Sequence, residues 1–192
     1  MKKLALGILG SGKGSNCRAI LEQIRDGKVA AEARLVVSDV FDAGILDIAR
    51  EFGVPNVYLP PGNFRTRLEP AVEAELVRLL RQAGVELVVL AGFMRVLKEP
   101  MLVAFPRQII NIHPSLLPKF PGIEAWKQAL AAKEKITGCS VHYVDAGIDS
   151  GEIIGQRKVP VLADDTPESL HARIQNAERA LYPEVIAQFC EA

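Results

Sequence analysis

Short apolar runs alternate along the chain with segments that repeat apolar residues at helical spacing. The run Leu4–Leu9 ends in glycines, which predicts a buried strand. Ser15–Asp26 then repeats apolar residues three and four positions apart, which predicts a helix that stops at Gly27. The alternation continues, and it predicts strands over Ala33–Ser38, Val54–Leu59, Val85–Ala91 and Gln108–Ile112, and helices over Ala43–Phe52, Arg67–Ala83, Glu99–Phe105 and Ala125–Ala132.

The last third of the chain has a different order of elements. Two strands are predicted over Thr137–Val144 and Glu152–Val159, and their connection is too short for a crossover helix, so we expect them to be antiparallel. A closing amphipathic helix is predicted over Pro167–Cys190. Together the elements predict an α/β fold: a doubly wound, mostly parallel open sheet with helices on both faces and an antiparallel strand pair late in the chain. We expect residues 1–192 to form a single domain.

Composition narrows the class of protein. The chain has 192 residues, of which 49% are hydrophobic and 24% charged, a balance that argues against disorder. Its formal net charge is zero, which gives no global attraction for nucleic acid. Cys17, Cys139 and Cys190 show no paired spacing, so a disulfide scaffold is not expected. No apolar run approaches the ~20 residues of a membrane span. We expect a soluble cytoplasmic protein with no nucleic-acid partner and no membrane.

The segment Asn111–Pro118 carries the clearest chemical signal. Residues two apart on an extended chain point to the same side, so Asn111 and His113 should face one space. Pro114 restricts His113 to extended geometry and ends the strand there. An amide can polarise a carbonyl while an imidazole moves a proton, and this pairing is suited to acyl transfer.

A glycine-rich turn, Gly10–Asn16, joins the first predicted strand to the first helix. Backbone N–H groups at a helix start attract phosphate, and glycine allows close approach of an anion. The turn matches neither the Walker A pattern nor the dinucleotide fingerprint. A ribose contact from Asp39 stays open, as does the alternative that Ser15 or Asn16 only caps the helix.

Other polar residues leave alternatives open. Asp149 could orient His113 and favour its charged form, or it could form an Asx turn with its own backbone. His142 lies near a strand end, and His171 is expected on the surface of the last helix. Two histidines and an acid could bind metal, but no metal-binding spacing is present, so no metal is expected.

Two arginines, Arg67 and Arg95, are candidates for binding an acidic ligand. Arg95 follows the central strand among apolar residues that could wall a pocket for a flat ring. The alternative for both arginines is a solvated side chain on a packed turn.

Taken together, these motifs resemble the phosphoribosylglycinamide (GAR) formyltransferases, a folate-dependent formyltransferase family of purine biosynthesis. The resemblance spans nearly the whole chain. Its anchors are residues 12–16, 89–95, 111–118, 138–142, 145–151 and 175–183. It implies an enzyme that moves the formyl group of the co-substrate 10-formyltetrahydrofolate to the amine of GAR. The products are formyl-GAR and tetrahydrofolate, on the route to IMP. Whether the protein forms a homodimer is left open.

The resemblance also implies site residues by position. The catalytic set falls on Asn111, His113 and Asp149. The GAR site falls on Gly14, Ser15, Asn16, Gln175 and Glu178, with Lys13 standing where the family motif has asparagine. The folate site falls on Arg67, Met94, Arg95, Val96, Leu97, Asn111, Asp145, Ala146, Gly147, Ile148 and Asp149.

The implied reaction is direct attack of the unprotonated amine on the formyl carbon. Asn111 and a protonated His113, held by Asp149, would stabilise the tetrahedral intermediate. Three rival readings stay open. A 10-formyltetrahydrofolate hydrolase would carry an amino-terminal regulatory domain, and none fits before Leu4. A methionyl-tRNA formyltransferase would carry a further carboxy-terminal domain and a basic surface. A non-catalytic nucleotide-binding protein would need only the glycine turn.

Overall fold

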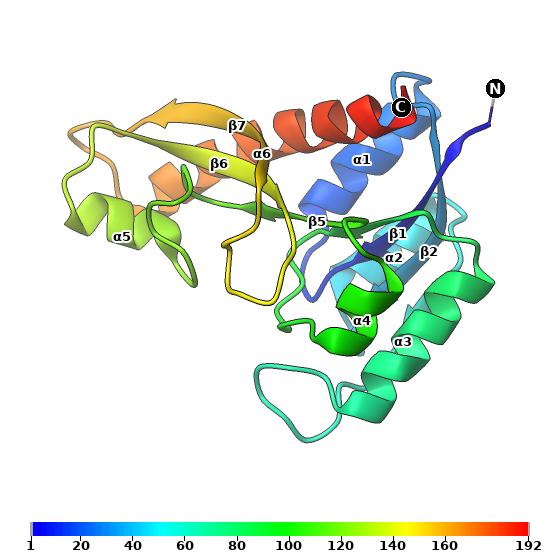
Figure 1. Cartoon of the computed structure of the whole chain (residues 1–192). Helices are drawn as coiled ribbons and strands as arrows, with labels where there is room; N and C mark the ends of the chain where they lie inside the picture. The colour runs from blue at the N-terminus through cyan, green and yellow to red at the C-terminus, as the bar shows by residue number, and fades with distance from the viewer. Residues whose placement is uncertain (1, 192) are drawn as a thin grey trace.

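The computed structural model describes residues 2–191, and its centre is one seven-stranded sheet in the order β3-β2-β1-β4-β5-β6-β7 (Figure 1). The strands are β1 (Leu4–Leu9), β2 (Ala31–Ser38), β3 (Asn56–Tyr58), β4 (Leu87–Leu90), β5 (Ile109–His113), β6 (Ile136–Tyr143) and β7 (Ile153–Pro160). The helices are α1 (Ser15–Arg25), α2 (Gly44–Glu51), α3 (Pro70–Gln82), α4 (Glu99–Ala104), α5 (Ala125–Ala131) and α6 (Pro167–Cys190).

The strand directions confirm the predicted fold class. Strands β1 to β5 are parallel to one another, whereas β6 runs antiparallel to both β5 and β7. The chain builds outward from β1 to β3 and then returns to place β4 on the other side of β1. Ligands of such sheets bind where the strand order reverses, beyond the carboxyl ends of the strands. The loops after β1 and β4 meet at this place.

Helices cover both faces of the sheet, and each face has its own apolar core. On one face, α1, α2 and α6 pack residues such as Ile20, Ile45 and Ile186 against the strands. On the other, α3 and α4 contribute Leu80 and Met101. Figure 1 shows α1 and α6 side by side on one side of the sheet and α3 and α4 together on the other. Because β4 is buried on both faces, its sequence is an unbroken apolar run.

Several predicted boundaries are corrected. The helix predicted from Arg67 begins only at Pro70, because proline occupies the first helical position and Arg67 instead bridges to Val96 in extended geometry. The strand predicted over Val54–Leu59 shortens to Asn56–Tyr58, because only these three residues pair with β2. Loop geometry and strand pairing set these ends, and periodicity does not reveal them.

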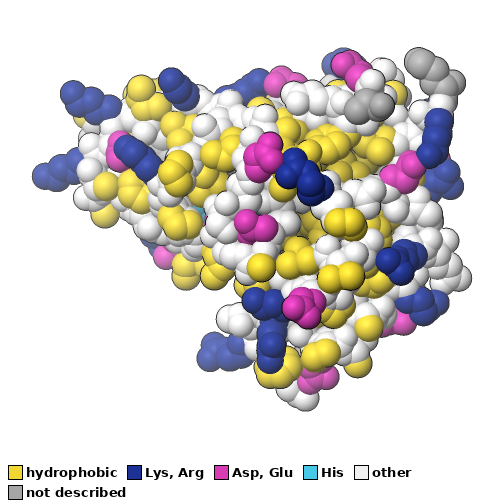
Figure 2. All heavy atoms as spheres, viewed as in Figure 1, with side chains coloured by type: hydrophobic (Ala, Val, Ile, Leu, Met, Phe, Trp, Pro, Cys, Tyr) yellow, Lys and Arg dark blue, Asp and Glu magenta, His cyan; other side chains and the backbone are white. Residues whose placement is uncertain are grey.

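The surface shows no strong segregation of charge on the face that Figure 2 draws, where basic, acidic and apolar side chains are interspersed. Within residues 2–191, no helix is both long enough and apolar enough to cross a bilayer.

Candidate active site

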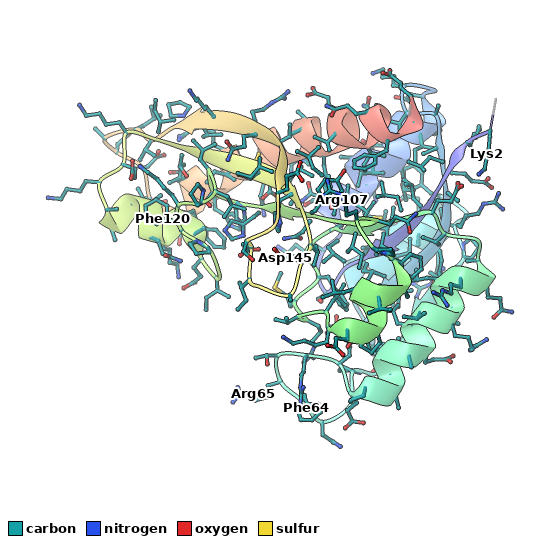
Figure 3. All side chains as sticks on the ribbon, in the orientation of Figure 1. Lys2, Phe64, Arg65, Arg107, Phe120 and Asp145 are labelled. Carbon is teal, nitrogen blue, oxygen red and sulfur yellow. The ribbon has the colours of Figure 1, made fainter. Side chains whose placement is uncertain are left out.

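A cavity of about 410 Å³ lies where β4 and β5 end and the β6–β7 loop folds back over them. Its volume is within the usual range for a small-molecule site. The cavity wall is mostly apolar, and its polar floor is formed by Asn111, His113, His142 and Asp149. Figure 3 shows Asp145 on the β6–β7 loop and Phe120 on the loop before α5, the two loops that border this space.

Asn111 lies opposite His142 on the neighbouring antiparallel strand. Its Nδ2 is 3.2 Å from His142 Nε2, and His142 Nδ1 is 2.8 Å from the carbonyl oxygen of Tyr143. A carbonyl only accepts, so Nδ1–H donates to it, and in the neutral ring Nε2 accepts from the Asn111 amide. This contact orients the amide and leaves its second N–H for a ligand.

His113 is buried at the end of β5, and both of its ring nitrogens face oxygen atoms. Nε2 is 2.8 Å from the carbonyl oxygen of Phe120, and Nδ1 is 3.2 Å from Asp149 Oδ2. The expected pairing of His113 with Asp149 is therefore present in the structure. Two oxygen acceptors around one imidazole suit a ring that holds a second proton during a reaction.

The net effect on His113 differs from the expectation that Asp149 keeps the ring charged. Burial lowers the pKa of His113 below its ordinary value, and this outweighs the opposing effects of the Phe120 carbonyl and the Asp149 carboxylate. The nearby His142 lowers that pKa further. The resting ring is therefore biased toward the neutral form, and it is suited to accept a proton rather than to arrive with one.

Asp149 is held in an uncommon backbone conformation, with φ at 50°. Its Oδ2 accepts from the Gly122 N–H at 2.8 Å, and its Oδ1 lies 3.5 Å from His142 Nε2. Burial opposes ionisation, but the neighbouring His142, the hydrogen bond from the Gly122 N–H and the nearby His113 ring together hold the pKa of Asp149 below its ordinary value. The Asx-turn alternative for Asp149 is wrong, because Asp145 caps this loop instead, accepting from the Gly147 N–H and the Ser150 hydroxyl.

The residues predicted to bind folate fall into two groups. Arg67 and Ala146 do not line the cavity, and Arg67 is exposed with its guanidinium over the Phe64 ring. The guanidinium of Arg95 is paired with Asp39 through Nε and hydrogen-bonded to two backbone carbonyls through Nη1. The predicted residues that do line the cavity are Met94, Arg95, Val96, Leu97, Asn111, Asp145, Gly147, Ile148 and Asp149.

The glycine turn begins α1 without a side-chain cap. Gly14 is the N-cap residue, in left-handed geometry with φ at 78°, so the alternative that Ser15 or Asn16 caps the helix is wrong. A Cβ at Gly14 would lie 2.8 Å from Ile45 Cα, so glycine is required for packing as well as for φ. By contrast, α6 has a capping box from Thr166 and Ser169. The first N–H groups of α1 are thus free of side-chain caps.

The predicted GAR residues on α1 and α6 meet away from the cavity lining. Asn16 Nδ2 donates to Glu178 Oε2 at 3.1 Å, and Asn16 Oδ1 is buried with no hydrogen-bond partner among the described residues. Burial raises the pKa of Glu178 to about 7, despite the opposing Asn16 contact. Gln175 lies one turn from His171, which is half-buried rather than on the surface and stacks on Trp126 at 3.6 Å.

Sequence reasoning missed two parts of this site. His142 was left without a role, and Trp126, which lines the cavity, was not singled out. The role of His142 becomes visible only in the pairing of β6 with β5, which places His142 opposite Asn111. Asp39 was considered for a ribose, but both of its oxygens are taken by Ser11 and Arg95. Within residues 2–191, no three His, Cys, Asp or Glu side chains are grouped to hold a metal ion.

Comparison with known proteins places this geometry in a family. The formyl transferase family model matches residues 3–186. A phosphoribosylglycinamide formyltransferase of Bacillus subtilis is 41% identical over 188 residues, covering 98% of this chain and 94% of that protein. The crystal structure of glycinamide ribonucleotide transformylase 1 from Symbiobacterium toebii superposes with a TM-score of 0.94 at 47% identity, covering 98% of this chain and 88% of that one.

A longer relative also matches. The trifunctional purine biosynthetic protein adenosine-3 of Drosophila pseudoobscura pseudoobscura is 46% identical over 184 residues, and the chain spans 13% of its length. The family resemblance drawn from the motifs is confirmed, and the chain belongs to the formyl transferase family.

Proposed function

We propose that this protein transfers the formyl group of 10-formyltetrahydrofolate to the amine of GAR, giving formyl-GAR and tetrahydrofolate in purine biosynthesis. The observation that carries the proposal is the convergence of Asn111, His113 and Asp149 on the floor of one cavity in a chain of this family. We further propose that residues 1–192 act as one formyltransferase domain.

The cavity suits the folate. Its apolar wall, formed in part by Met94, Val96 and Leu97, offers contact area for a flat ring system. The GAR phosphate is assigned to the start of α1, where the uncapped N–H groups of Gly14, Ser15 and Asn16 and the helix dipole favour an anion. Gln175 and Glu178 lie on the adjacent α6 and are assigned to the rest of GAR. Arg67 and Ala146 lie outside the cavity lining, so their assignment to the folate site rests only on their position in the family motif.

The chemistry begins with the amine of GAR. Its lone pair forms a bond to the formyl carbon, and the carbonyl electrons move onto the oxygen. The free N–H of Asn111 donates to that oxyanion, an interaction that is stronger in the intermediate than in the substrate. Because His142 holds the amide in place, little reorganisation is needed when the charge develops.

Proton transfer completes the reaction. The attacking nitrogen loses a proton to the His113–Asp149 pair, through water or through the Asp149 carboxylate, since both ring nitrogens of His113 face protein oxygens. The lowered pKa of His113 favours the neutral ring beforehand, so the ring can take up this proton. The ionised Asp149 then stabilises the imidazolium. As the bond from carbon to the folate nitrogen breaks, that nitrogen takes a proton from the pair, directly or through water. The steps need neither a metal ion nor a covalent enzyme intermediate.

The deciding experiment offers the purified protein three acceptors with 10-formyltetrahydrofolate: GAR, water and methionyl-tRNA. Tetrahydrofolate should form faster than in the enzyme-free control only when GAR is the acceptor. In the Asn111→Ala variant, kcat should fall by ~10²–10³-fold, as for loss of one oxyanion donor. The matched control is Asn176→Ala, on the exposed face of α6, which should retain wild-type kcat. Formate released at the same rate without GAR would indicate a hydrolase and contradict the proposal.

A cytoplasmic location and a homodimer are also proposed. The homodimer is checked by sedimentation equilibrium over a range of concentrations, and a single monomeric mass throughout would exclude it.

A further inference from the structure

Asp39 is a buried carboxylate that the reaction does not use. It follows the last residue of β2, and both of its oxygens accept hydrogen bonds from other segments. The Ser11 hydroxyl donates to Oδ1 at 2.5 Å, and Arg95 Nε donates to Oδ2 at 2.6 Å. The Asp39 side chain is 2% exposed and that of Arg95 is 17% exposed, so the pair is shielded from solvent screening.

Ser11 connects Asp39 to the cavity wall. Its hydroxyl oxygen accepts from the Met94 N–H at 2.8 Å, and its own N–H donates to the Gly92 carbonyl at 3.0 Å. The hydroxyl proton is directed to Asp39, which leaves its lone pairs for Met94. The glycine turn is thereby hydrogen-bonded to the start of the segment 92–97, which lines the cavity.

Arg95 extends the same network to a third segment. While its Nε binds Asp39, its Nη1 donates to the carbonyl oxygens of Phe64 at 2.9 Å and Arg65 at 2.6 Å. Figure 3 shows these two residues on the loop between β3 and α3, which projects from the rest of the fold. One carboxylate therefore joins the glycine turn, the cavity wall and this loop.

We infer that Asp39 is a positioning residue that couples the two substrate sites. Through Ser11 and Arg95 it fixes the position of the glycine turn relative to the cavity wall formed by residues 92–97. The inference rests on the proposed function, which assigns the glycine turn to the GAR phosphate and the wall to the folate. A ligand that immobilises one segment lowers the ordering cost of the other, so each ligand tightens binding of the second.

The test measures that coupling by calorimetry with tetrahydrofolate, which cannot react. Its Kd is determined with and without saturating GAR. In the wild type, GAR should tighten tetrahydrofolate binding by roughly fivefold or more, the lower end of typical coupling between sites. Ser11→Ala removes the hydroxyl links to Asp39 and Met94 but keeps the Arg95–Asp39 pair and the Ser11 N–H bond. We expect its ratio of the two Kd values to fall to about one, with a thermal midpoint close to wild type.

A second variant and a control separate positioning from folding. Asp39→Asn replaces an oxygen that accepts with an amide N–H₂ that cannot, so KM should rise for both substrates and the coupling should be lost. The matched control is Glu75→Gln, an acid in an exposed two-bond pair with Arg78 on α3, which should keep both the coupling and the activity. A lower thermal midpoint with unchanged KM values and unchanged coupling would assign Asp39 a structural role only and overturn the inference.

The inference and the proposed function fail differently. If the wild type formylates GAR but shows no coupling, or if Ser11→Ala keeps the full coupling, the inference is wrong and the function stands. If neither the wild type nor Glu75→Gln formylates GAR, the proposed function is wrong and the inference falls with it.

Discussion

Asn111 and His142 occupy opposed positions on β5 and β6, and the Asn111 amide nitrogen lies 3.2 Å from His142 Nε2. The Tyr143 carbonyl fixes the His142 tautomer, and His142 in turn fixes the direction of the amide. The donor that the mechanism needs for the oxyanion is thus oriented before substrate binds. Both residues lie within paired strands, Asn111 in the middle of β5 and His142 one residue before the end of β6, and strands place side chains more rigidly than loops do.

This relationship predicts a role for His142 in turnover. His142→Ala removes the acceptor that orients the Asn111 amide, so kcat should fall by up to ~10²-fold, the lower end of the cost of an oxyanion donor. The KM for 10-formyltetrahydrofolate should change little, and steady-state kinetics with each substrate varied would check both values. Loss confined to KM would show that His142 shapes binding rather than the intermediate.

His113 is expected to carry the proton transfer. His113→Ala should lower kcat by ~10²–10⁴-fold, the range for a positioned acid–base group. The substitution also leaves the Phe120 carbonyl without its donor, so the thermal midpoint must be recorded alongside the rate. A folded variant with nearly normal turnover would remove His113 from the mechanism.

Asp149→Asn should shift the pH profile while keeping the loop conformation, because asparagine tolerates the positive φ of this position. The Asp149 carboxylate raises the pKa of His113 against the larger effect of burial, so its removal should lower that pKa further. The acidic limb of kcat/KM that reports His113 should move to lower pH. NMR titration of the His113 ring checks the cause, and equal pKa values in both proteins would disprove the coupling.

Glu178 should make stability fall as the pH rises. Burial raises its pKa from 4.5 to about 7 on folding, so the folded state binds a proton more tightly. The stabilising contribution is complete below the unfolded pKa and is lost as the pH rises through about 7, a change on the order of 3 kcal/mol. Urea unfolding at pH 5 to 8 should show a flatter profile for Glu178→Gln. The exposed Glu184→Gln, also on α6, is the control and should follow the wild type.

Two glycines of the turn should respond differently to alanine. Gly14→Ala meets Ile45 Cα at 2.8 Å and forces a positive φ, so it should destabilise the fold by about 2 kcal/mol or more. A Cβ at Gly12 would have no atom within 4 Å, so Gly12→Ala should fold normally. Thermal unfolding of both variants checks this contrast, and equal midpoints would show that the contact with Ile45 and the positive φ do not constrain Gly14.

Local pattern was sufficient for the elements and for the strongest motif. The alternation of apolar runs and helical segments is a property of neighbouring residues, so it predicted every strand and helix to within a few positions. The two-residue spacing of Asn111 and His113 predicted a common space, and both residues line the cavity. The short connection Asp145–Gly151 predicted the antiparallel pair of β6 and β7.

Which distant residues meet was decided only by the tertiary structure. His142 reaches Asn111 because β6 inserts beside β5, and Asp39 joins Ser11 to Arg95 because β4 returns beside β1. No local period encodes either pairing. The lowered pKa of His113 was missed for the same reason, since burial by residues from several elements outweighs the one carboxylate that the motif suggested. Sequence determined which groups are present, while packing decided their partners and their charge.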